Sequence, residues 1–253
     1  MNDNILLKSI FPIALENGDG WVHETRGTAY LLHYNGTRFI VTAWHCIRNI
    51  IKHRYAKIGI IDDNNISHDM IKSVIEENCS FGFTGAPNCW RIPINFVHRA
   101  IEKNVGKIFD ILFLCIDEER LKNNKGTSLS GIEALNLSTQ PLRIGSKYKI
   151  YGYPDAEMDK ENKIIRLSSR YLCLIKIKSE NVEELELEQG LLSFEQNDCH
   201  ATFNGYSGGA VLDDNNDVLG MIIRASDDEK CVRFITSRTL IRMLQQITQQ
   251  DSE

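Results

Sequence analysis

The sequence has no apolar run long enough to span a membrane, and its N-terminus has no basic segment followed by a sustained apolar core. A membrane-spanning helix needs about 20 mostly apolar residues, and a secretory signal needs both of those N-terminal parts. We therefore expect a cytoplasmic protein that does not act on a membrane. The net charge of −5 also argues against nucleic acid as the main partner.

Cysteine is present without any paired pattern. The seven cysteines are odd in number and scattered, and no two form a C-x-x-C pair. Structural zinc sites commonly draw their ligands from such pairs, so we expect neither a metal nor a cofactor. Disulfides are rare in reducing compartments, which agrees with a cytoplasmic protein. Cys115 and Cys173 lie in apolar runs and are expected in the core.

No histidine follows Ser207, which lies in the glycine-rich segment Phe203–Val211. Glycine at this density indicates a turn with unusual dihedrals or a close backbone approach. Such a turn can expose a nucleophilic hydroxyl beside converging N–H groups, although a hairpin with a solvated serine fits the same residues. Gly205-x-Ser207-x-Gly209 also fits the nucleophile elbow of α/β-hydrolases, in which the histidine follows the serine. All seven histidines precede Ser207, so the elbow is excluded and the order His, Asp, Ser remains open.

A hairpin is predicted just before one of those histidines. The strand-like runs 27–34 and 37–43 are joined by Asn35-Gly36, and a two-residue Asn-Gly link is a strong hairpin signal. His45 directly follows the second run, where a side chain can leave the sheet and face a cleft. A single histidine is more often structural, so its role depends on the residues near it.

Asp110 is the one charged residue in the apolar run Ile108–Ile116. A carboxylate in such a run is costly unless it is hydrogen-bonded or paired. We expect a dedicated partner, although an aspartate that caps a turn at a strand start fits the same pattern.

The remaining pattern is mostly strands and polar loops. Further strands are predicted near residues 10–15, 56–61, 92–97, 147–151, 171–178, 184–188, 218–224 and 231–235. Residues 118–140 are polar and are expected to form a linker. Ser237 is expected to cap a terminal helix. That helix would bury one apolar stripe, formed by Leu240, Ile241, Leu244 and Ile247.

Four segments together resemble the chymotrypsin/trypsin-like serine peptidases, in that family's order. They are residues 27–32, 41–46, 109–114 and 205–209, and Gly152-Tyr153-Pro154 and the terminal helix add a likeness to the bacterial-type branches. The resemblance covers roughly residues 27–248. It implies an all-β fold of two antiparallel six-stranded β-barrels followed by a C-terminal α-helix.

The resemblance also implies a division of the chain and of the chemistry. Residues 1–120 would form the barrel with the histidine and aspartate, 121–140 the linker, 141–236 the barrel with the nucleophile, and 237–253 the helix and tail. His45 would be the general base, Asp110 would orient its ring, and Ser207 would attack the substrate. The amides of Gly205 and Ser207 would bind the oxyanion.

The sequence departs from the family at two positions. No cysteine precedes Cys46, so the disulfide that commonly braces the histidine loop cannot form. Tyr206 stands where members activated by cleavage carry an aspartate that pairs with a new N-terminus. We therefore expect a disulfide-free member that is not activated in that way.

The substrate pocket is less readable. By resemblance Ala201 would lie at its floor, which leaves no carboxylate there for a Lys or Arg side chain. Thr202 resembles the pocket threonine of glutamyl endopeptidases, and Ile222 or Ile223 would form apolar walls. Arg224 either adds positive charge at the rim or is a solvated strand residue.

The expected function is a serine endopeptidase of narrow specificity that acts on a protein or peptide. Without a secretion signal, an unspecific active protease would endanger its own cell, so a regulatory protein partner, a selective pocket or an inactive resting site is expected to restrain it. The alternative is a catalytically silent member that uses the same fold as a protein-binding module. An esterase without peptidase activity would carry the same triad.

Overall fold

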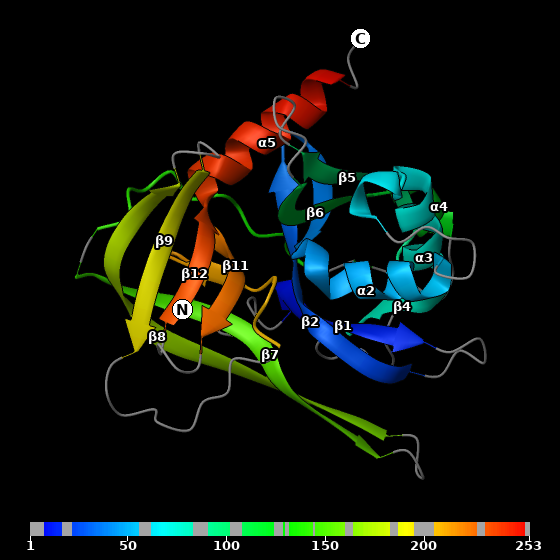
Figure 1. Cartoon of the computed structure of the whole chain (residues 1–253), viewed down its shortest axis with the longest axis horizontal. Coiled ribbons are helices and arrows are strands. Elements are labelled where there is room, and N and C mark those ends of the chain that lie inside the picture. The colour runs from blue at the N-terminus through cyan, green and yellow to red at the C-terminus, as the bar shows by residue number, and fades with distance from the viewer. Residues whose placement is uncertain are drawn as a thin grey trace.

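The computed structural model describes residues 8–16, 22–55, 62–82, 91–101, 108–123, 129, 132–143, 145–159, 164–182, 187–194, 205–226 and 231–250. Two antiparallel sheets make up most of the structure, and a long helix follows the last strand (Figure 1). The predicted all-β class with a C-terminal helix is confirmed.

The first sheet has six strands in the order β4-β1-β2-β3-β6-β5. Their bounds are β1 (Ile10–Glu16), β2 (Val22–Tyr34), β3 (Thr37–Thr42), β4 (Cys79–Phe81), β5 (Ile94–Ile101) and β6 (Ile108–Ile116). Within the described ranges no pairing joins β4 to β5, so this sheet is open at that seam where a closed barrel was predicted. All three residues of the short β4 pair with β1 on its other side.

The second sheet is a closed barrel in the order β10-β11-β12-β9-β8-β7. Its strands are β7 (Lys147–Asp159), β8 (Ile164–Val182), β9 (Leu187–Phe194), β10 (Ala210–Leu212), β11 (Val218–Ser226) and β12 (Cys231–Thr236). β7 pairs with β10 only at residues 149–151, whereas its pairing with β8 runs on to 159. The β7–β8 hairpin therefore projects beyond the barrel (Figure 1).

The predicted hairpin is present, and its turn shows why the sequence specified it. Asn35 and Gly36 have φ values of 47° and 80°. Two consecutive positive φ values define the type I′ turn, which matches the twist of the flanking strands and favours Asn-Gly. β2 and β3 pair from Tyr34↔Thr37 to Ala29↔Thr42, so the chain leaves the sheet just before His45.

Helices lie where the sequence analysis expected only short strands and loops between residues 47 and 105. The elements are α2 (Trp44–Tyr55), the 3-10 turn η2 (Asp63–Asn65), α3 (His68–Asn78) and, further on, α4 (Glu118–Asn123). α2 buries Trp44, Ile47 and Ile51, which share one helical face, and the Ser67 hydroxyl caps α3. The strand predicted at 56–61 lies outside the described residues.

Residues 132–140, inside the predicted linker, pair with both sheets. The Leu135 amide donates to the Leu31 carbonyl at 2.8 Å, and the Val218 amide donates to the Asn136 carbonyl at 2.8 Å. The segment is therefore held to both sheets by main-chain hydrogen bonds.

The last helix, α5 (Ser237–Gln250), buries Leu240, Leu244 and Ile247, while Ile241 is half-buried. The residue that caps α5 is Thr236, one residue before the predicted Ser237. The Thr236 hydroxyl accepts from the Thr239 amide at 3.5 Å, whereas the Ser237 hydroxyl donates to a linker carbonyl. No helix among the described residues is both long and apolar enough to cross a membrane.

Candidate active site

Asp110 and His45 meet although 65 residues separate them in the chain. His45 is the second residue of α2, directly after β3, and Asp110 is the third residue of β6. The Nδ1 atom of His45 lies 2.6 Å from Oδ2 of Asp110, and the His45 main-chain N–H donates to Oδ1 at 2.8 Å. The two side chains are 44% and 31% exposed, so the pair lies at the surface of the molecule rather than in the core.

The second of these hydrogen bonds has a structural cause. The first amides of an α-helix have no partner within the helix, and a carboxylate at that end is favoured by the helix dipole. Asp110 satisfies one such amide from a neighbouring strand. It therefore caps α2 and contacts the imidazole ring at once, so the dedicated partner expected for Asp110 is His45.

The same carboxylate changes the acid–base behaviour of the ring. Its hydrogen bond to the ring raises the pKa of His45 from 6.5 to about 10, with a further contribution from the adjacent Cys46 thiol. Burial opposes the shift. The contact with Asp110 therefore favours the protonated form of the ring in this arrangement.

Ser207 lies against the segment that follows His45. Its carbonyl accepts from the Thr28 amide at 2.9 Å and from the Cys46 thiol at 3.6 Å. The turn with the predicted nucleophile is thus docked on the first sheet beside α2. The structure brings His45, Asp110 and the Ser207 backbone into one region between the two sheets.

The amides of the glycine-rich turn fall into two groups among the described residues. Gly205 and Gly208 have φ values of 93° and 83°, a region that residues with a side chain rarely adopt. The amides of Gly208 and Gly209 donate to the carbonyls of Ile222 and Tyr206, both at 2.8 Å. By contrast, no backbone carbonyl within the described ranges accepts from the amide of Gly205 or of Ser207.

Close packing explains why two glycines are required here. A Cβ on Gly208 would lie 2.2 Å from the Thr28 carbonyl oxygen and 2.5 Å from the Thr42 hydroxyl. A Cβ on Gly152, from the Gly152-Tyr153-Pro154 segment, would lie 2.6 Å from the Tyr206 ring. The glycines thus allow the turn to seat directly on the first sheet and on β7.

Cys46 is a free, buried thiol, as expected from the missing partner. A Cβ on Gly27 would lie 3.6 Å from the Cys46 Cβ, within the range of about 3.5–4.5 Å found in disulfides. Gly27 therefore occupies the place where a bridging cysteine would stand. The Cys46 thiol uses that space to approach the Ser207 carbonyl instead.

The support beneath His45 was not found from the sequence. Trp44 stacks on the buried guanidinium of Arg99, whose Cζ lies 4.9 Å from the ring centroid. Arg99 also donates to the Asp63 carbonyl at 2.8 Å, while the Asp63 carboxylate binds Arg48 and Lys52 of α2. These contacts fix the start of α2, and nothing in the sequence pattern pairs residues so far apart.

The residues assigned to the substrate pocket are only partly described. Ala201 and Thr202 lie outside the described residues. Ile222 is fully buried, Ile223 is half-buried, and Arg224 is exposed on β11.

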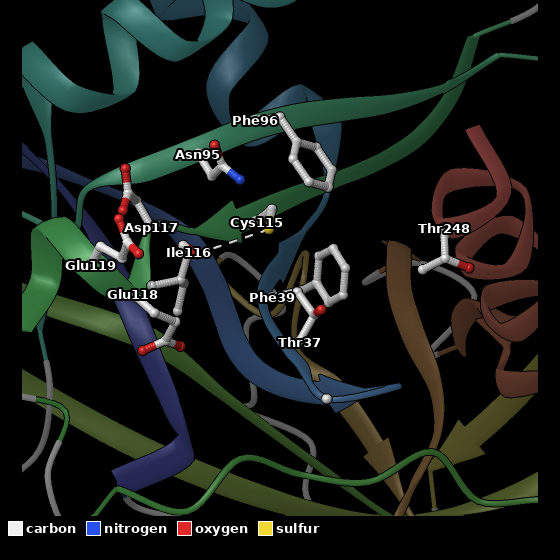
Figure 2. A pocket seen from close by; sticks show the side chains of 11 residues that line it. Thr37, Phe39, Asn95, Phe96, Cys115, Ile116, Asp117, Glu118, Glu119 and Thr248 are labelled. Carbon is white, nitrogen blue, oxygen red and sulfur yellow. Dashed lines mark hydrogen bonds between the residues drawn. The ribbon is translucent and has the colours of Figure 1, made fainter. Parts of the chain in front are cut away.

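A cavity of about 500 Å³ lies elsewhere, between the first sheet and the end of α5, and it contains none of the residues just discussed. Figure 2 shows two phenylalanine rings in its middle and three carboxylates at one end. It is lined by Gly36, Thr37, Phe39, Asn95, Phe96, Cys115, Ile116, Asp117, Glu118, Glu119 and Thr248. No group of three or more His, Cys, Asp or Glu residues suited to a metal ion occurs in the described part of the chain.

Comparison with known proteins supports the fold. No family model matches the chain, and no curated protein matches its sequence. Among solved structures, it is similar to the inactive form of the Rv3671c protease (12% identity, TM-score 0.51, 95% of this chain and 89% of that one). The active form of that protease, from M. tuberculosis, gives 12% identity and a TM-score of 0.54 over 96% and 83% of the two chains. Human heparin binding protein gives 11% identity and a TM-score of 0.53 over 93% and 88%. The chain therefore has the predicted chymotrypsin-like fold.

Proposed function

We propose that this protein is a serine endopeptidase that hydrolyses peptide bonds through a Ser-His-Asp triad. The observation that carries the proposal is the double hydrogen bond from His45 to Asp110, beside a docked Ser207 turn. An imidazole held by a carboxylate, next to a serine on a glycine-rich turn, has the groups that serine activation needs.

In this mechanism the Ser207 hydroxyl attacks the carbonyl carbon of the scissile bond, and its proton passes to Nε2 of His45. Asp110 stabilises the imidazolium through the bond to Nδ1. When the tetrahedral intermediate collapses, the amine leaves with that proton and an acyl-enzyme remains. Water then attacks the ester by the same route, which releases the acid and regenerates Ser207.

The oxyanion of the intermediate would be bound by the amides of Gly205 and Ser207. Neither amide donates to a backbone carbonyl among the described residues, which supports this assignment. Each such donor contributes about 10²–10³-fold to turnover in related chemistry.

For specificity we keep the assignment of Ala201, Thr202, Ile222 and Ile223 to a neutral pocket. The exposure of Arg224 favours a solvated residue over a charged pocket rim. Medium-sized neutral or apolar side chains are then the preferred residues before the cleaved bond.

We also propose that the resting enzyme is restrained. A general base works best with a pKa near the working pH, and the raised pKa of His45 leaves the ring protonated at pH 7. A substrate or regulatory protein that buries the His45 ring further while leaving its bond to Asp110 in place would lower that pKa and activate Ser207.

A protein-binding module is the second candidate. The fold alone does not exclude it, since one similar structure is named for binding heparin and not for catalysis. An esterase would use the same residues as the peptidase and differ only in the substrate it accepts.

Labelling with a small fluorophosphonate tests the proposal without a known substrate. We expect modification at Ser207, its loss in Ser207→Ala and its strong reduction in His45→Ala. Ser237→Ala is the matched control, because that buried hydroxyl bonds to the linker carbonyl of Ser138 and should leave labelling intact. A folded protein that the fluorophosphonate never labels favours the binding module. A labelled protein that hydrolyses esters and cleaves no peptide favours the esterase.

A further inference from the structure

Thr28 joins the first sheet to the turn that carries Ser207. It is completely buried, and it lies 177 residues before Gly205 in the chain. Its hydroxyl donates to the Gly205 carbonyl at 2.6 Å and accepts from the Tyr153 amide at 3.0 Å. Its own amide donates to the Ser207 carbonyl at 2.9 Å.

The register of β1 leaves the main chain of Thr28 free for this role. Pro12 lies opposite Thr28 in the sheet, but the Pro12 carbonyl accepts from the Gly82 amide on the other side of β1. In an antiparallel pair the N–H and C=O of one residue point to the same side, so Pro12 and Thr28 form a pair without main-chain hydrogen bonds between them. The Thr28 carbonyl accepts from the Thr42 hydroxyl at 2.8 Å, and the Thr28 amide is left for the Ser207 carbonyl.

These hydrogen bonds hold the peptide groups on both sides of the Ser207 amide. The C=O and N–H of a trans peptide point in opposite directions, so holding one carbonyl fixes the amide across the same bond. Glycine at 205 would otherwise rotate readily. The Thr28 hydroxyl holds the Gly205 carbonyl, the Thr28 amide holds the Ser207 carbonyl, and the Gly209 amide holds the Tyr206 carbonyl between them.

We propose that Thr28 is a positioning residue for the oxyanion hole: its hydroxyl holds the Gly205 carbonyl, and with the bonds to the Tyr206 and Ser207 carbonyls this keeps the Ser207 amide aimed at the oxyanion. This inference rests on the proposed peptidase function. Thr28 does not touch the substrate. Thr28 lies in the first sheet, and the Gly205 carbonyl that it holds belongs to the second barrel. Alignment of the oxyanion hole therefore depends on docking of the two sheets.

Thr28→Val tests this, because valine keeps the shape and removes the hydroxyl. Hydrolysis of p-nitrophenyl acetate should show kcat lowered by about 10–100-fold, somewhat less than deletion of an oxyanion donor. KM should change by less than about threefold, because the lost interaction acts only in the transition state. The pH dependence should keep its shape, since the His45–Asp110 pair is untouched. Thr28→Ser should restore most of kcat.

A matched control separates this role from a general loss of stability. Thr236→Val also removes a buried threonine hydroxyl, the cap of α5, far along the chain from the turn. It should lower Tm and leave kcat unchanged. Should Thr28→Val not fold, Thr28→Cys keeps a weak donor at the same place and should give an intermediate kcat.

The outcomes distinguish this inference from the function on which it rests. If the wild-type protein is not labelled by fluorophosphonate, the proposed function fails and the positioning role falls with it. If the wild-type protein is labelled and Thr28→Val retains full kcat, the function stands and the positioning role is wrong. A loss in Thr28→Val that Thr28→Ser does not restore would also overturn it.

Discussion

Asp110 accepts two hydrogen bonds from His45, one from the ring and one from the main chain of the same residue. The main-chain bond fixes the position of His45 relative to Asp110, and the ring bond fixes the orientation of the imidazole, because rotation of the ring would break it. Catalysis by the proposed triad depends on that ring orientation. Substitutions at either residue separate the role of the main-chain hydrogen bond, which holds the helix start, from the role of the ring hydrogen bond, which serves catalysis.

Asp110→Asn should preserve the fold and lower kcat by about 10⁴-fold. The asparagine oxygen can still accept from the His45 amide, which places its NH2 group against Nδ1. That arrangement forces the proton onto Nε2, so the ring can no longer accept the Ser207 proton. Steady-state kinetics and circular dichroism measure the two effects.

Glu118→Gln is the control for that substitution. It is also a carboxylate-to-amide change, in a two-bond ion pair with Arg38 at 2.6 Å, but it lies outside the candidate active site. It should leave kcat unchanged. Near-normal turnover in Asp110→Asn would mean that another carboxylate serves His45.

The pH dependence follows from the raised pKa of His45, about 10 against 6.5 for the free residue. Since only the neutral ring accepts a proton, kcat/KM should rise with pH about tenfold per unit throughout the range below the folded pKa of about 10. Asp110→Asn should move that limb toward lower pH. A wild-type profile that is already flat at pH 7 would contradict the restrained resting state.

The same shift has a consequence for stability. A pKa raised on folding means that the protonated ring stabilises the native state. The contribution is complete below pH 6.5 and is lost as pH rises through about 10. The ring is 44% exposed, so solvent screening keeps the effect small. It should appear as a Tm difference between wild type and His45→Gln that narrows as pH rises.

The predictions that the structure confirms rest on short sequence patterns. The Asn35-Gly36 turn, the apolar run around Asp110 and the glycines near Ser207 each depend on neighbouring residues, so the sequence shows them directly. The order of the four motifs then sufficed for the fold. These signals also predicted that Asp110 has a dedicated partner, which the structure identifies as His45.

The features that the sequence could not predict depend on contacts between residues far apart in the chain. The helix α2 contains β-prone residues such as Ile50 and Ile51, and it buries Trp44 over Arg99, a contact between residues 55 positions apart. Thr28 appeared only as part of a strand motif. Its bonds to Gly205 and Ser207 depend on docking between two sheets, which no local pattern encodes.

Gly208→Ala should unfold or inactivate the protein, whereas Gly145→Ala should be tolerated. Both glycines have φ near 80°, so the backbone strain of the alanine is alike in the two variants. Only Gly208 is crowded, by the Thr28 carbonyl and the Thr42 hydroxyl, while nothing lies within 4 Å of a Cβ on Gly145. Overpacking should cost Gly208→Ala about 1–3 kcal/mol more. Chemical denaturation measures the difference, and equal losses would contradict the docked turn.

Strong reductant should leave both the fold and the activity unchanged. Of the described thiols, Cys46, Cys79 and Cys115 are buried and none is part of a disulfide. A native disulfide commonly contributes about 2–4 kcal/mol, which corresponds to a Tm change of several degrees in a chain of this size. Thermal melts with and without reductant should therefore superimpose. A fall of that size on reduction would require a disulfide among the other cysteines.

The substrate preference gives the last test. A pocket with Ala201 at its floor, one hydroxyl from Thr202 and apolar walls has no counterion for a Lys or Arg head group. Burial of an unpaired charge there would cost several kcal/mol. A peptide-library cleavage profile should therefore show medium-sized neutral or apolar residues before the cleaved bond. Because Arg224 is exposed, Arg224→Ala should leave that profile unchanged. A preference for acidic residues that Arg224→Ala abolishes would place Arg224 at the pocket rim, and dominant cleavage after Lys or Arg would overturn the pocket assignment.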